Sequence, residues 1–222
     1  SMVQSSAQSL IRNISESAIY LYNIAGNSVS VGTTAKISNL GIAYAKHAIV
    51  IDSSAYNSVW FDNIVFEQID SNCIIVDAQN TVYFNNMYSE LAPLDSASSC
   101  FYIGVSNAAL GLDANVVVTN SILGGYNSAT LFDIDNCTGL RVENSTFSSW
   151  KTTLKTTANT ESVVWDNNII IGVTNTILTQ ITGGAGRAFI ADSTNVSIVE
   201  SKQDNGNGVS VLKSARLYSP LI

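Results

Sequence analysis

The sequence predicts an all-β protein, a right-handed parallel β-helix whose chain coils as a solenoid of about 23 residues per turn, or rung. The main observation is a short pattern of alternating apolar and variable residues closed by Asn, which recurs along the 222 residues. Successive Asn residues of the pattern lie 24, 23, 34, 24 and 23 positions apart. The composition agrees, because 46% of the residues are hydrophobic and only 12% are charged, with few strong helix formers. The recurrences are 35–39, 59–63, 82–86, 116–120, 140–144 and 163–167, and a variant at 196–200 ends in Glu.

The chain before the first clear recurrence is expected to divide at residue 19. Residues 1–18 begin with Ser1-Met2, which resembles an expression scar, and continue as an N-terminal cap or linker. Residues 19–222 are expected to form a single β-helix domain. Within it, Ile19-Tyr-Leu-Tyr-Asn23 resembles a first, short rung, 16 residues before Asn39.

A second apolar segment follows the Asn in each rung. Two or three short strands in about 23 residues leave no room for helices, so each strand must pair with its equivalent one rung on, about 4.8 Å away. Crossovers between parallel strands are right-handed, which sets the hand of the coil. The second segments are 47–52, 73–77, 100–103, 131–135 and 188–192, with weaker versions at 153–156 and 209–212.

The recurring Asn residues are expected at bends, one above another. There each side-chain amide can bond the Asn of the next rung, which gives an internal Asn ladder. We interpret these residues as structural rather than catalytic.

Two insertions interrupt the regular spacing. The first lies between Asn86 and Asn120 and comprises 88–96 and 106–113. The second contains Thr182-Gly-Gly-Ala-Gly-Arg187, which lacks the Lys-Ser/Thr of a phosphate-binding loop. Loops inserted on one side of a solenoid usually wall its binding groove.

The three cysteines, Cys73, Cys100 and Cys137, lack the spacing of metal ligands, and no metal or cofactor is expected. Cys73 and Cys100 share a position in the repeat, so they should stack on neighbouring rungs. Side chains stacked in one column run parallel, which favours buried thiols over the alternative of a disulfide.

The net charge of −7 and the absence of a Lys/Arg cluster argue against nucleic acid and against an anionic membrane surface as partners. No apolar run approaches the roughly 18 residues of a membrane span, so membrane insertion is not expected either. A neutral ligand fits this charge balance better.

A solenoid with an Asn ladder, rungs near 23 residues and a texture rich in Ser, Thr, Asn and Val resembles the pectate-lyase-like β-helix superfamily, and within it bacteriophage tailspikes and tail fibres. The resemblance covers about residues 19–212. It implies a homotrimer on the virion tail, or otherwise extracellular, that binds and often cleaves bacterial surface polysaccharide. The calcium-binding Asp cluster and catalytic Arg of pectate lyases are not recognisable, so that chemistry is not carried over.

Two outward carboxylates are the candidate catalytic pair. The position before each Asn places Glu143 and Asp166 one rung apart, about 5 Å by strand spacing, and two carboxylates so close can serve a glycosidase as an acid and a nucleophile or base. Arg141 lies on the same outward face and is a candidate for substrate binding, as is Asp62, about three rungs away. The alternative is an exposed ion cluster without catalytic function.

Outward aromatic residues are the candidate sugar platform. Trp60 and Tyr83 occupy one position on adjacent rungs, and Trp150 lies in a turn after Asn144. Their alternative role is to pack against the next subunit of a trimer.

Three functional hypotheses follow. The first is a tailspike-type β-helix that binds bacterial surface polysaccharide and, if it is an enzyme, hydrolyses it as a glycoside hydrolase (a polysaccharide depolymerase). It predicts an outward groove that holds Glu143, Asp166 and Arg141 beside an insertion. The second is a non-catalytic structural shaft or adhesin segment of a trimeric fibre. The third is a secreted polysaccharide lyase.

Overall fold

The computed structural model shows an all-β chain without helices in the described residues, which confirms the predicted class. The described residues are 9–21, 35–52, 58–77, 81–104, 114–126, 129–135, 137–156, 162–171, 175–181, 187–191, 196–203 and 209–212. The strands are β1 (Ser9–Leu21), β2 (Ala35–Ile51), β3 (Val59–Glu67), β4 (Ile74–Val76), β5 (Thr81–Glu90), β6 (Ser99–Gly104), β7 (Ala114–Thr119), β8 (Ile122–Gly124), β9 (Thr130–Asp135), β10 (Cys137–Glu143), β11 (Thr146–Ser148), β12 (Thr152–Thr156), β13 (Ser162–Asp166), β14 (Ile169–Ile171), β15 (Asn175–Ile181), β16 (Arg187–Ala191), β17 (Val196–Gln203) and β18 (Val209–Leu212).

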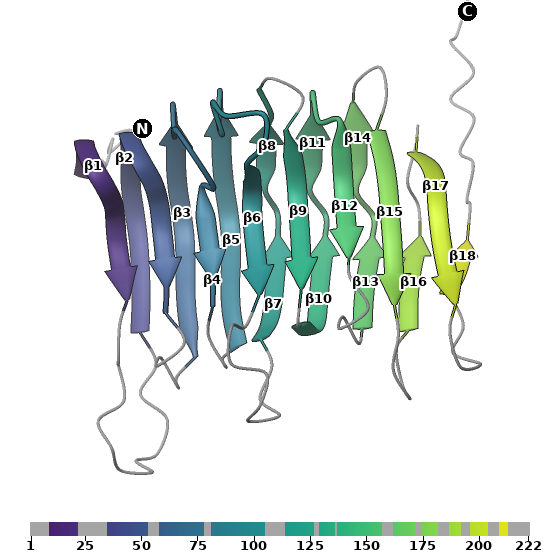
Figure 1. Ribbon diagram of the computed structural model, residues 1–222. Helices are drawn as coiled ribbons and strands as arrows, with labels where there is room; N and C mark the ends of the chain where they lie inside the picture. The colour runs from purple at the N-terminus through teal and green to yellow at the C-terminus, as the bar shows by residue number, and fades with distance from the viewer. Residues whose placement is uncertain are drawn as a thin grey trace, which may run out of the picture.

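All pairings among these strands are parallel. They connect equivalent segments rather than sequence neighbours, so the chain returns to the same place before each new strand is added. Figure 1 shows the result as one layer of strands that includes β4, β6, β9 and β12 in front of another that includes β3, β5, β7 and β10 and points the other way. This curled parallel sheet is compatible with a β-helix.

The pairings define three faces. The first face contains β7, β10 and β13 with the starting halves of β2, β3 and β5. The second face contains β8, β11 and β14 with the later halves of β3 and β5. The third face contains β4, β6, β9 and β12 with the end of β2.

A left-handed backbone conformation marks each bend between the first and second faces. The repeat Asn residues have φ between 50° and 59° there, a region that Asn tolerates better than most residues. The residues are Asn39, Asn63, Asn86, Asn120, Asn144 and Asn167.

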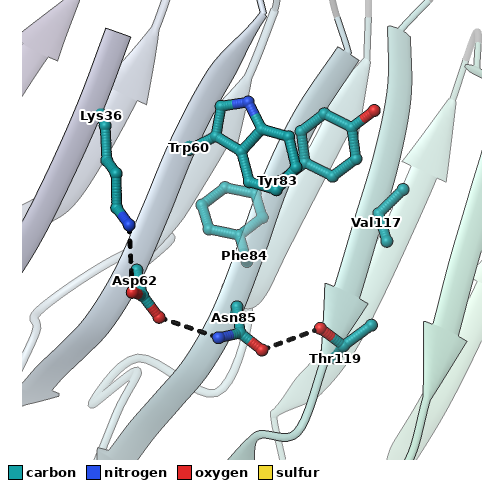
Figure 2. A pocket seen from close by; sticks show the side chains of 8 residues that line it. All are labelled: Lys36, Trp60, Asp62, Tyr83, Phe84, Asn85, Val117 and Thr119. Atoms are coloured by element: carbon teal, nitrogen blue, oxygen red, sulfur yellow. Dashed lines mark hydrogen bonds and ion pairs between the residues drawn. The ribbon is translucent and has the colours of Figure 1, made fainter.

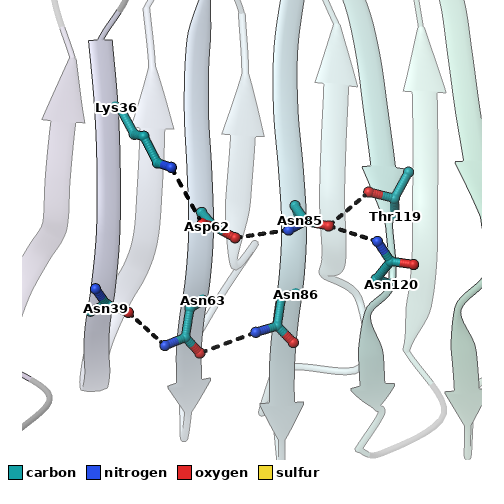
Figure 3. Close-up of polar contacts among 8 residues, drawn as sticks. All are labelled: Lys36, Asn39, Asp62, Asn63, Asn85, Asn86, Thr119 and Asn120. Carbon is teal, nitrogen blue, oxygen red and sulfur yellow. Dashed lines mark hydrogen bonds and ion pairs between the residues drawn. The ribbon is translucent and has the colours of Figure 1, made fainter. Parts of the chain in front are cut away.

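Side-chain amides connect several of these bends (Figure 3). Asn63 Nδ2 donates to Asn39 Oδ1 at 2.7 Å, and Asn86 Nδ2 donates to Asn63 Oδ1 at 3.3 Å. Asn120 Nδ2 donates at 2.8 Å to Oδ1 of Asn85 and not to Asn86, the repeat Asn of the preceding rung. The insertion between Asn86 and Asn120 therefore coincides with a change of amide partner. Further along, Asn167 Nδ2 donates to Asn144 Oδ1 at 2.6 Å.

A run of aromatic rings fills the core. Phe61 stacks on Phe84 with ring centroids 5.2 Å apart, and Phe84 meets Phe101 edge-on at 5.3 Å. Phe101 stacks on Phe132 at 4.8 Å, and Phe132 meets Trp165 edge-on at 5.9 Å. All five side chains are almost wholly buried, so these rings join rungs from β3 to β13.

The cysteines behave as the sequence predicts. The pairing of Ile74 with Phe101 places Cys73 beside Cys100, and all three cysteines are buried free thiols. Burial, followed by the hydrogen bond with Cys100, raises the pKa of the Cys73 thiol well above its usual value. A buried thiol of raised pKa is a packing residue rather than a nucleophile.

The N-terminal assignment needs correction. Ile19 pairs with Ile49 near the end of β2, so the segment that begins at Ile19 continues the second-strand position and not the position that ends in Asn. Asn23 lies outside the described residues. β1 already begins at Ser9 and pairs with β2, so part of the segment assigned to a cap or linker is strand.

The two segment types are exchanged near the C-terminus. Residues 188–192 and 209–212 were expected as second segments, but β16 pairs with β13 of the first face and β18 pairs with β16. Residues 196–200 were expected as a variant of the Asn pattern, but β17 pairs with β15, which pairs with β12 of the third face.

Two further expectations meet the structure differently. Trp150, considered an exposed aromatic, is only 2% exposed, because its indole packs inward and Nε1 donates to the Leu123 carbonyl at 3.0 Å. In the insertions, residues 88–90 extend β5, whereas residues 106–113 and 182–186 lie outside the described part of the chain.

Candidate functional site

Two parallel rows of outward side chains cover the first face. The residues that directly precede each repeat Asn form one row, which we call the polar row. The residues two positions before those of the polar row form the other, which we call the mixed row. Strand register confirms that each row is continuous from β2 to β13. The polar row is Ser38, Asp62, Asn85, Thr119, Glu143 and Asp166, and the mixed row is Lys36, Trp60, Tyr83, Val117, Arg141 and Val164.

The predicted aromatic platform is present in the mixed row. The rings of Trp60 and Tyr83 stack with centroids 3.8 Å apart and planes 11° apart. Trp60 remains 40% exposed although its ring is stacked. The pair therefore presents apolar ring surface on an otherwise polar face, which is the usual environment for a sugar ring.

A chain of polar contacts runs beside the platform (Figures 2 and 3). Lys36 Nζ lies 3.5 Å from Asp62 Oδ2, and Asn85 Nδ2 donates to Asp62 Oδ1 at 2.8 Å. Thr119 Oγ1 donates to Asn85 Oδ1 at 3.1 Å. These contacts fix the rotamers of four neighbouring side chains, so their remaining donors and acceptors are held in position.

Two hollows lie along the rows. The first, of about 240 Å³, lies over β2, β3, β5 and β7 (Figure 2), and the second, of about 540 Å³, continues over β7, β10 and β13. Both share Tyr83 and Val117, so they form one groove across the strands. The first is lined by Lys36, Trp60, Asp62, Tyr83, Phe84, Asn85, Val117 and Thr119, and the second by Tyr83, Asn115, Val117, Gly139, Leu140, Arg141, Glu143 and Val164.

The candidate catalytic residues are neighbours, as predicted. Glu143 of β10 is in register with Asp166 of β13, and adjacent strands lie about 4.8 Å apart. Arg141 Nη2 is 2.6 Å from Glu143 Oε1, and this hydrogen bond and ion pair raise the pKa of the guanidinium. In a hydrolytic reaction the Glu143 carboxylate, held in place by Arg141, would suit the role of nucleophile or base, and Asp166 is the neighbouring carboxyl group.

The structure divides the predicted site residues into two groups. Trp60, Tyr83 and Asp62 meet in the first hollow, and Arg141 and Glu143 meet in the second. Asp166 lines neither, but it adjoins Glu143. The described residues 88–96 of the first insertion also line neither hollow, so strand residues form the groove where the sequence predicted a loop wall.

Sequence reasoning missed the four polar residues Lys36, Asn85, Asn115 and Thr119 among those that line the groove. Lys36 lies one rung before Trp60 in the same outward position, so extending the row by one rung would have found it. Asn85 and Thr119 were read as members of the polar row without being considered as ligands of a substrate.

Other candidates lie elsewhere. His47 Nδ1 donates to the Asn72 carbonyl at 2.7 Å, and it lies near the end of β2 that belongs to the third face rather than on the first face. Within the described ranges, no three His, Cys, Asp or Glu side chains are grouped so that they could hold a metal ion. That part of the chain also contains no helix long and apolar enough to cross a membrane.

No protein-family model, curated protein or solved structure matches this chain.

Proposed function

We propose that the chain is a right-handed parallel β-helix with an internal Asn ladder and rungs of about 23 residues. Four side-chain hydrogen bonds between adjacent strands of the first face support this rung, because each joins residues that lie 23 or 24 positions apart. The amide bonds among Asn39, Asn63 and Asn86, and between Asn144 and Asn167, support the ladder. A β-helix presents long, flat faces, and function then depends on what one face carries.

We infer that the first face binds bacterial surface polysaccharide, as in a phage tailspike or tail fibre. One observation carries this inference: a stacked Trp60–Tyr83 pair adjoins a fixed row of carboxylate, amide and hydroxyl groups along a groove. Sugars present apolar ring faces and hydroxyl edges, so they need both kinds of surface side by side. The ion pairs Lys36–Asp62 and Arg141–Glu143 balance most of the local charge, which favours neutral sugars.

Trp60→Ala is expected to weaken glycan binding by about tenfold or more, because exposed aromatic anchors commonly contribute over ~1.4 kcal/mol to binding. Binding would be measured on an array of purified capsule and O-antigen polysaccharides, followed by calorimetry with the best ligand. Tyr102→Ala is the matched control, since Tyr102 is an exposed aromatic of the third face.

Two results would contradict this function. Equal losses in the Trp60 and Tyr102 variants would show that binding does not depend on the first face. A complete absence of binding across the array would favour the structural shaft.

Hydrolysis is a second candidate function, supported by the register of Glu143 and Asp166. Glu143→Gln is expected to lower the release of new reducing ends by about a hundredfold or more while the protein stays folded, because the amide cannot act as nucleophile or base. Glu67→Gln, an exposed change on the second face, is the control. Cleavage that persists in the Glu143 variant would exclude this pair, and binding without cleavage by the unchanged protein would make the chain a recognition module.

The shaft and the homotrimer are supported by a different surface. On the second face, Tyr88, Ile122 and Ile169 lie in one row, with Thr146 between the two isoleucines, and are 42%, 54% and 54% exposed. Large exposed apolar side chains gathered on one face commonly mark an interface between proteins. We propose that copies of the chain associate through this row, on the virion tail or otherwise outside the host cell. Light scattering tests the association, and a monomer at all concentrations would refute it.

A further inference from the structure

One face of the Tyr83 ring is left open by the stack. Trp60 covers the face toward β3, and the other face turns toward β7 (Figure 2). There the mixed row continues with Val117, which is in register with Tyr83 but much shorter than an aromatic ring. The open ring face therefore borders the second hollow rather than another side chain of its own size.

The second hollow has the shape of a short slot between two walls. Tyr83 is one wall, and Arg141, two strands further on, is the other. Two strand spacings separate the backbones of these residues by about 9.6 Å. Val117 forms the floor between them, and this interval holds one sugar ring in contact with Tyr83 but not two stacked rings.

The ends of the slot carry hydrogen-bonding groups. Asn115 lies at the end where the strands start, and Glu143 with Arg141 lies at the other. Gly139 leaves room for the Asn115 amide, because a Cβ at this position would lie 2.9 Å from Asn115 Oδ1 and would displace it. An amide at one end and a carboxylate–guanidinium pair at the other can bond hydroxyls on opposite edges of one ring.

The orientation of the Tyr83 ring decides how a ligand enters. Stacked carbon atoms approach to about 3.5 Å, so most of the 3.8 Å between the ring centroids is separation between the ring planes, with a sideways offset of about 1.5 Å. Their faces therefore turn mainly along the line from strand to strand. A sugar stacked on Tyr83 has the same orientation, and its equatorial linkages then point along the strands or out to solvent, not along the row.

We propose that the second hollow binds a single neutral pyranose, a terminal or side-branch residue of the glycan, which enters edge-first between Tyr83 and Arg141. The inference rests on the glycan-binding function proposed above and adds the kind of residue recognised. A terminal residue has free hydroxyls on both edges, and these match the polar groups at the two ends of the slot.

Val117→Tyr tests the proposal, because a third ring stacked beside Tyr83 would fill the slot while keeping a residue that favours strands. We expect it to weaken binding of a branched polysaccharide by about tenfold or more. The matched control is Ile75→Tyr, at an outward position of β4 on the third face, which should bind as the unchanged protein does. Gly139→Ala is a milder second variant and should weaken binding severalfold. Circular dichroism confirms the fold of each variant.

Two ligand experiments complete the test. Methyl glycosides of the neutral hexoses and 6-deoxyhexoses should compete for the site, and periodate oxidation of the terminal residues of the polysaccharide should abolish its binding. Wild-type affinity in Val117→Tyr, or binding that survives periodate and is not inhibited by any methyl glycoside, would overturn the terminal-residue proposal. If the terminal-residue proposal fails in this way but Trp60→Ala still loses glycan binding, the proposed glycan-binding function of the first face stands. No binding of any glycan by the unchanged protein would refute both.

Discussion

Phe101→Ala is expected to lower the free energy of unfolding by about 4 kcal/mol, since truncating a buried Phe typically costs ~3–5 kcal/mol. Phe101 is fully buried and contacts the rings of Phe84 and Phe132, so the deletion opens a cavity in the middle of the aromatic run. Strands on both sides are held in register by hydrogen bonds and cannot close over the gap. Guanidinium unfolding followed by circular dichroism measures the loss.

Phe101→Leu is the matched control. It keeps most of the volume and should cost less than about 1.5 kcal/mol. A loss below about 1 kcal/mol in the Ala variant would mean that the strands move together and fill the cavity, so that the core around Phe101 is not rigidly packed.

Asn63→Ala is expected to lower the free energy of unfolding by about 2–5 kcal/mol, because two separate contributions are lost. The first is conformational: Asn63 has φ of 56°, which costs a residue with a plain Cβ about 1–2 kcal/mol. The second is the pair of amide bonds, given to Asn39 and received from Asn86, each contributing about 0.5–1.5 kcal/mol.

Asn63→Gly separates the two contributions. Glycine adopts the left-handed conformation without strain, so this variant should lose only the amide bonds and gain flexibility in the unfolded chain. It should therefore be more stable than Asn63→Ala in the same thermal unfolding experiment. The reverse order would show that the bend does not depend on the left-handed conformation.

Much of the site could be predicted because two simple periods determine it. Alternation along a strand decides which side chains point outward, and the repeat Asn fixes where each strand stands against the next. Together they place Trp60 beside Tyr83 and Glu143 beside Asp166 without any knowledge of loops. The ion pair of Arg141 with Glu143 follows from the same alternation, because residues two apart on a strand share a face.

The parts that escaped prediction have no distinctive residue to mark them. A second set of bends has positive φ at Tyr44, Gln68, Leu91 and Ser149, whose residue types do not signal that conformation, and only Asn13, the equivalent of Tyr44, is a type that does. The Ile19–Leu21 segment was misplaced because a short apolar alternation before an Asn looks the same on either of two faces. Trp150 was expected at the surface because it follows a turn, yet its indole is bonded to a backbone carbonyl in the interior.

The parallel register also bears on how such a chain can change in length over evolutionary time. Ser121 and Ser145 occupy equivalent places, since Thr119 pairs with Glu143 and Ile122 with Thr146. Deleting 121–144, or duplicating it, would join Asn120 or Asn144 to an equivalent successor, and every column on either side would still match its neighbour. Unequal recombination in whole rungs is therefore tolerated by the backbone, whereas a deletion of one residue would turn the following strand inside out. Through such events the rows of side chains on the first face could be lengthened or shortened without a new fold.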